Sequence, residues 1–130
     1  MDEAIFILVI IGGIFNLGFA IYHSTFWKVF RWKQELAKIS RLNRNVVQII
    51  NLCLTYILLA MAFISFVYTR DLINTSFGNI ILLIIFLFWF LRMIEQVLYF
   101  GFKNKMSIVF TLIFLLGSLL YLVPFILIKV

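Results

Sequence analysis

Residues 79–102, NIILLIIFLFWFLRMIEQVLYFGF, decide the fold class, because this run is long and apolar enough to cross a lipid bilayer. Arg92, Glu95 and Gln96 lie inside the same run. An ionisable side chain within a transmembrane helix is costly unless it faces a partner or water, so it marks a candidate functional site. The run therefore predicts both a transmembrane helix and a polar site within it.

The rest of the chain has the same character. Of its 130 residues, 65% are hydrophobic and only 12% are charged, which lies outside the range of soluble globular domains. Four apolar runs, at residues 4–22, 46–68, 79–102 and 107–128, are each long enough to span about 30 Å of hydrocarbon. We therefore predict an all-α integral membrane bundle of four transmembrane helices, with residues 1–130 as a single domain.

The basic residues predict the orientation of this bundle. Eight of them fall in the two connections on one side, namely Lys28, Arg31, Lys33, Lys38, Arg41, Arg44, Lys103 and Lys105. Only Arg70 and Lys129 fall on the other side, and cytoplasmic loops retain Lys and Arg. We expect both termini outside, in a bacterial inner membrane. The net charge of +6 then reflects topology and contact with membrane lipids, and no nucleic-acid partner is predicted because the chain has no soluble basic face.

Residues 24–44 form a predicted amphipathic segment between the first two transmembrane helices. Its aromatic and apolar side chains alternate with cationic ones, which is typical of a segment that lies in the membrane interface. The predicted anchor residues are Trp27, Lys28, Arg31, Trp32 and Lys33. A lid over a cytoplasmic-side pocket is the functional alternative.

The third helix carries the densest set of polar side chains. Arg92, Glu95, Gln96 and Tyr99 follow i, i+3, i+4 and i+7 spacing, which predicts that all four project from one face. At about 1.5 Å of rise per residue, Arg92 lies about 16 Å from the cytoplasmic boundary near Lys103. That depth is too great for these side chains to reach water easily.

Two other helices are expected to contribute to the same layer. The second offers Asn45, Gln48 and Asn51, and the first offers Asn16 and His23, which are two turns apart on one face. The sequence thus predicts one intramembrane polar cluster in the cytoplasmic half of the bilayer. With a single His and a single Cys in the chain, no metal site is predicted.

The cluster has two interpretations. In the first, Arg92 and Glu95 neutralise each other and the amides join helices or subunits through hydrogen bonds of about 0.6 kcal/mol each. In the second, the cluster lines a pocket with aromatic walls in which Arg92 holds an anion and Glu95 or His23 exchanges a proton.

A short motif at the start of the second helix resembles a known family. In RLNRNVVQIIN, residues 41–51, Arg41, Asn45 and Gln48 are similar to the Arg-x-x-x-Asn-x-x-Glu signature of the microsomal glutathione transferases, the membrane-associated eicosanoid and glutathione metabolism family. Arg92 and Tyr99, seven residues apart, resemble that family's third helix. Gln48 departs from the family's glutamate.

The resemblance implies a homotrimer that binds glutathione between subunits at the cytoplasmic side and receives a lipophilic electrophile from the bilayer. Arg41, Asn45, Arg92 and Tyr99 would then contact glutathione. A lysine, Lys103 or Lys105, would stand where the family has a thiol-activating arginine, without the planar fork of a guanidinium.

Several classes of function follow. The first is a small polytopic membrane protein with a buried polar cluster and no assigned reaction. The alternatives are a non-catalytic accessory subunit of a larger membrane complex, a glutathione-transferase-like enzyme acting on lipophilic substrates, and a small ion or proton conductor. The expected partners are membrane lipids, other membrane protein subunits or further copies of the chain. Conduction is the least favoured, because the outer half of the predicted bundle carries few polar groups beyond Tyr68, Ser118 and Tyr121.

Overall fold

The computed structural model describes residues 2–129, and within that range the chain is helical with no strand. Its four long helices are α1 (Asp2–Ser24), α4 (Arg41–Val67), α6 (Ser76–Phe100) and α7 (Lys105–Lys129). Each is long and apolar enough to cross a membrane. The predicted all-α fold with four potential membrane spans is therefore confirmed.

Two of the long helices, α4 and α6, begin before their apolar runs, at residues that a polar side chain caps. α4 begins at Arg41 rather than near residue 46, since the Ser40 side chain accepts a hydrogen bond of 3.2 Å from the backbone N–H of Asn43. α6 begins at Ser76, where the Thr75 side chain accepts one of 2.9 Å from the N–H of Gly78. These caps satisfy N–H groups that have no partner within the helix. A hydropathy pattern alone does not reveal them.

The segment between α1 and α4 consists of several short pieces. α2 (Phe26–Val29) and α3 (Trp32–Glu35) are single turns, and η1 (Leu36–Lys38) is a 3₁₀ turn. Arg31 separates α2 from α3 with a left-handed backbone at φ 52°. The predicted amphipathic segment 24–44 is therefore folded back on itself and does not form one continuous helix. On the opposite side of the bundle, α5 (Thr69–Asn74) joins α4 to α6.

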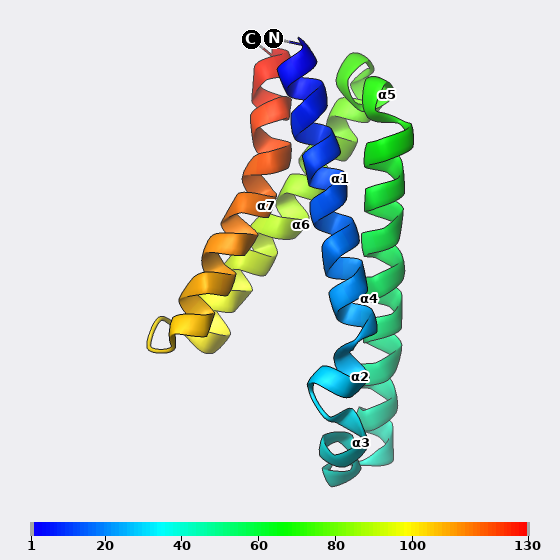
Figure 1. The fold of residues 1–130 in the computed structure, drawn as a ribbon, viewed down its shortest axis with the longest axis vertical. Helices are drawn as coiled ribbons and strands as arrows, with labels where there is room; N and C mark the ends of the chain where they lie inside the picture. Colours follow the sequence, from blue (N-terminus) through cyan, green and yellow to red (C-terminus); the bar gives the residue numbers. More distant parts are fainter. Residues whose placement is uncertain (1, 130) are drawn as a thin grey trace.

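The long helices pack as two pairs. α4 packs mainly against α1, α6 packs mainly against α7, and α1 and α7 join the pairs. The start of α1, the end of α7 and the α5 turn lie at one end of the molecule, where the pairs are close (Figure 1). Toward the other end, which carries α2, α3 and the α6–α7 connection, the pairs diverge (Figure 1). A pocket described below occupies this diverging region.

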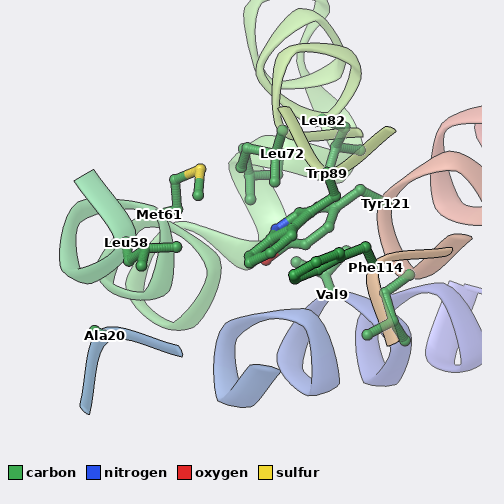
Figure 2. Packing of buried hydrophobic residues seen from close by; sticks show 11 residues of the cluster. Val9, Ala20, Leu58, Met61, Leu72, Leu82, Trp89, Phe114 and Tyr121 are labelled. Carbon is green, nitrogen blue, oxygen red and sulfur yellow. The ribbon is translucent and has the colours of Figure 1, made fainter. Parts of the chain in front are cut away.

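The buried core lies where the pairs meet. The rings of Trp89, Phe114 and Tyr121 lie together there (Figure 2), and those of Trp89 and Phe114 stack with their centroids 5.8 Å apart. Gly12 makes room for the ring of Tyr121, because a Cβ atom at that position would overlap the phenol. Close helix approach over small residues is the usual packing mode in membranes, where burial from water contributes little.

Gly78 and Gly18 provide a matched test of this packing. A methyl group at Gly78 would overlap the backbone of Asp71 and Leu72 in α5, whereas one at Gly18 would meet nothing within 4 Å. We expect Gly78→Ala to lower the free energy of unfolding by about 1–3 kcal/mol, because a backbone cannot move aside cheaply. Gly18→Ala should leave it unchanged or slightly higher. Thermal unfolding of the purified protein in mild detergent would measure both, and equal stability of the two variants would contradict the packing at α5.

Candidate functional site

A cavity of about 550 Å³ lies between the α1–α2 corner and the α6–α7 pair. We call it the aromatic pocket, because seven of its lining residues carry aromatic rings. The lining residues are Phe19, Tyr22, His23, Phe26, Phe30, Arg92, Gln96, Phe100, Asn104, Met106, Ser107, Phe110 and Phe114. Its volume falls within the range of small-molecule binding sites, about 300–1,000 Å³.

Arg92 supplies the positive charge of the pocket. Its guanidinium lies over the ring of Phe114, with the central carbon 4.5 Å from the ring centroid, and Nη2 donates a hydrogen bond of 3.3 Å to Oε1 of Gln96. The Glu95 carboxylate is 4.0 Å from Nη1, at the limit of an ion pair. The side chain of Arg92 is 34% exposed, and one of its five N–H donors is used in the bond to Gln96. Such a guanidinium is held in place yet able to contact a ligand.

Gln96 and Ser107 fix the position of that guanidinium. Gln96 is buried, and its Nε2 donates a hydrogen bond of 3.1 Å to Oγ of Ser107. Ser107 in turn donates one of 2.7 Å to the backbone carbonyl of Gly101, where the chain leaves α6 with a positive φ of 66°. This chain of bonds ties the end of α6 to the start of α7, so the amide oxygen that accepts from Arg92 is rigidly placed.

His23 lies on the α1 side of the pocket and is held by Asn51 from α4. The amide Nδ2 of Asn51 donates a hydrogen bond of 3.0 Å to the backbone carbonyl of His23. Oδ1 of the same amide is 3.0 Å from Nδ1 of the imidazole. The ring of His23 also packs against that of Phe26, with centroids 4.2 Å apart. His23 is thus held in one orientation by side chains from α4 and α2.

The structure brings together only part of the predicted cluster. Arg92, Gln96 and His23 line the pocket, and Asn51 lies directly behind His23. Glu95 and Tyr99 lie outside it, because the side chain of Glu95 is 57% exposed and Tyr99 is 82% exposed on the outer surface of α6. The expectation that all four polar residues of this helix join one cluster is therefore corrected, because only Arg92 and Gln96 line the pocket. At 3.6 residues per turn, Glu95 and Gln96 point about 100° apart around the helix axis, and Tyr99 lies two turns beyond Arg92 toward the end of α6.

The predicted polar residues near the start of α4 also lie apart from the pocket. Arg41 and Asn45 are exposed, and Gln48 donates a hydrogen bond of 3.2 Å to the carbonyl of Arg44 on its own helix. The pocket lining within residues 2–129 comes from α1, α2, α6, α7 and the adjoining loops. Within one chain, then, the residues that resemble the glutathione transferase motif do not converge with Arg92.

The segment after α1 forms one wall of the pocket. Phe26 and Phe30 contribute their rings to the lining. Four of the predicted anchor residues are exposed, namely Trp27, Lys28, Arg31 and Lys33, whereas Trp32 is half-buried with its ring 5.9 Å from that of Phe26. The segment therefore combines an exposed cationic side with an aromatic side that covers the pocket.

Asn16 belongs to a separate network within the core. Its Nδ2 donates hydrogen bonds of 2.6 Å to the Tyr121 hydroxyl and 2.9 Å to the carbonyl of Gly12, and its Oδ1 accepts one of 3.1 Å from Nε1 of Trp89. The Tyr121 hydroxyl is also 2.7 Å from Oγ of Ser65. The expectation that Asn16 joins His23 at the polar cluster is corrected, because its partners on other helices are the core residues Trp89 of α6 and Tyr121 of α7.

Sequence reasoning did not place Asn104, Ser107 or most of the phenylalanines at the site. Seven rings gather at the pocket from four separate segments, and no spacing along one helix groups them. Among the described residues, no three His, Cys, Asp or Glu side chains are placed to hold a metal ion. Comparisons of the chain with protein-family models, curated proteins and solved structures found no match. The function is therefore inferred from the chemistry of the pocket itself.

Removing the Tyr121 hydroxyl should weaken the core network. Tyr121→Phe deletes the bonds to Asn16 and Ser65, and interhelical bonds in membrane bundles contribute about 0.6 kcal/mol each, so we expect a loss of about 1 kcal/mol in unfolding free energy. Tyr99→Phe is the control, since this exposed side chain has no bond to another helix among the described residues. Denaturant titration in detergent micelles would measure the difference. Equal stability of the two variants would show that the network contributes nothing measurable.

Proposed function

We propose that this protein binds an amphiphile with an anionic head group in the aromatic pocket, with Arg92 as the anchor of the anion. The observation that carries the proposal is the guanidinium of Arg92, which is held by Phe114 and Gln96 at the wall of a cavity between helices long and apolar enough to cross a membrane. Its weak contact with Glu95 leaves donors for a ligand. A guanidinium recognises carboxylate and phosphate oxygens through its planar fork of donors.

The remainder of the lining suits a hydrocarbon tail. Aromatic rings and Met106 make up most of the surface, and apolar lining with a few fixed polar groups is the usual composition of ligand pockets. A free anion in this setting would leave much of that apolar surface without a partner. An amphiphile can satisfy both parts of the pocket at once, with its tail continuing toward the bilayer.

The proposed ligand comes from the cytoplasmic leaflet. The pocket lies at the end of the bundle that carries Lys28, Arg31, Lys33, Lys103 and Lys105, and basic residues next to membrane spans favour the cytoplasmic side. The same cations attract anionic lipids, whose concentration would therefore be high near the pocket. Both termini then lie outside the cytoplasm.

Single cysteines would test this orientation. In a Cys53→Ser background, Asn74→Cys places a thiol on the α5 side and Lys103→Cys places one in the α6–α7 connection, both at exposed positions. We expect a membrane-impermeant maleimide to label Asn74→Cys in intact spheroplasts and to label Lys103→Cys only after permeabilisation. The opposite pattern would place the pocket in the outer leaflet.

A matched pair of probes would test the binding. Hexadecyl methyl phosphate carries one negative charge, and hexadecyl methyl ether has the same chain without it. We expect the phosphate to bind the protein in neutral maltoside detergent more tightly than the ether. Arg92→Gln should reduce phosphate affinity about 10- to 100-fold, because a hydrogen bond to a charged group contributes about 1.5–3 kcal/mol. Native mass spectrometry would measure occupancy across a titration of each probe.

Arg70→Gln is the control for that experiment. Arg70 lies over the ring of Phe6 at the opposite end of the bundle and should not affect binding. Equal affinity of wild type and Arg92→Gln for the phosphate would reject the proposal. Glutathione titrated in the same way tests the transferase-like alternative, and co-purification of a stoichiometric membrane partner that covers Arg92 would favour an accessory subunit.

A further inference from the structure

We infer that the head group recognised by the pocket carries a hydroxyl donor beside its anionic oxygen, and that Nε2 of His23 accepts the hydrogen bond from that hydroxyl. The ligand class is thus an anionic phospholipid with a hydroxylated head group, of the phosphoglycerol kind. This inference rests on the proposed function and specifies the chemistry of its ligand.

The side chain of Asn51 determines which tautomer His23 adopts. Nδ2 of Asn51 donates to the backbone carbonyl of His23, so the other atom of the same amide, Oδ1, is the one that faces the imidazole. A carbonyl oxygen can only accept, and therefore Nδ1 of His23 carries the proton in this bond. In a neutral imidazole the proton on Nδ1 leaves Nε2 as an acceptor.

Nε2, the other ring nitrogen of His23, is at least partly exposed. Every fully buried side-chain nitrogen and oxygen in the described part of the chain has a hydrogen-bond partner. Nε2 of His23 has none among the described residues, so it is not fully buried. Nδ1 is turned toward α4, and the cavity that His23 lines lies between α1–α2 and α6–α7. Nε2 is therefore an acceptor that the α1 side offers to a ligand, beside the hydroxyl of Tyr22, which lines the same cavity and can donate or accept.

Four polar side chains of the pocket lining differ in which hydrogen-bonding groups remain free for a ligand, namely Arg92, Gln96, Ser107 and His23. The amide oxygen of Gln96 accepts from Arg92, and its amide nitrogen donates to Ser107. The hydroxyl of Ser107 donates to the backbone carbonyl of Gly101. Arg92 has only donors to offer. Of these four side chains, Arg92 and His23 remain available to a head group, one as a cationic donor and the other as a neutral acceptor. Tyr22 and Asn104 also line the pocket, and their hydroxyl and amide groups can donate to an anionic oxygen. A ligand with only anionic oxygens would use Arg92 and leave Nε2 without a partner, which makes a donor hydroxyl the matching group.

Two phosphodiesters with the same tail would test this inference. Hexadecylphosphoglycerol and hexadecyl methyl phosphate each carry one negative charge, but only the first has hydroxyl donors. At pH 8, where neutral imidazole predominates, we expect the wild-type protein to bind the phosphoglycerol about 3- to 10-fold more tightly, the range that corresponds to one net hydrogen bond.

Two variants should abolish the preference by different routes. His23→Phe removes the acceptor while keeping a ring against Phe26. Asn51→Leu leaves the imidazole in place but removes the oxygen that holds the proton on Nδ1, so Asn51 acts as a positioning residue. Gln48→Leu is the control and should keep the preference, because Gln48 lies about one turn from Asn51 on α4 and its amide donates to the carbonyl of Arg44 on the same helix.

Each outcome bears on one of the two proposals. A preference in the wild type and in Gln48→Leu that disappears in His23→Phe and Asn51→Leu supports the inference. Equal binding of the two probes by the wild-type protein overturns it, even if His23→Phe does not fold, and so does a preference that persists in folded His23→Phe. If both probes bind equally and both weaken in Arg92→Gln, the anion site stands and only the hydroxyl inference fails. If neither probe binds, the proposed function fails as well.

Discussion

The amide of Asn16 has to find its hydrogen bonds within the protein, because the interior of a bilayer offers no water to a buried side chain. It finds them on Gly12, Tyr121 and Trp89, and the Tyr121 hydroxyl extends the network to Ser65. These residues lie on α1, α7, α6 and α4, so one network joins all four long helices at the same level. The rest of the arrangement depends on that junction.

The aromatic pocket lies beyond this junction, toward the end of the molecule that carries α2 and α3. The two helix pairs diverge from it (Figure 1). The cavity between them is lined by rings from α1, α6, α7 and the segment around α2. Arg92 lies less than one turn beyond the core residue Trp89, and Gln96 one turn further. The guanidinium is thus placed where close packing gives way to a cavity, and its stacking on Phe114 and its bond to Gln96 hold it there.

The polar side chains of the core network and those of the pocket differ in whether their hydrogen-bonding groups all have partners. In the core network around Tyr121, the polar atoms are buried and bonded to one another. In the pocket, by contrast, the side chain of Arg92 is partly exposed and Nε2 of His23 has no partner among the described residues. Satisfied polar groups in a membrane hold helices together, whereas unsatisfied ones at a cavity are available to a ligand.

The amino-acid sequence by itself determined the fold class and the presence of polar groups within the spans, since hydropathy depends on local composition and span length depends on bilayer thickness. It also identified Arg92, Gln96 and His23 as candidates, because their types are unusual at that depth. Helical spacing shows which residues share a face, but it does not fix how each helix rotates or which helix that face meets. The tertiary structure decided those points: it moved Asn16 into the core with Tyr121, 105 residues away, left Tyr99 and Glu95 outside, and gathered phenylalanines from separate segments around Arg92.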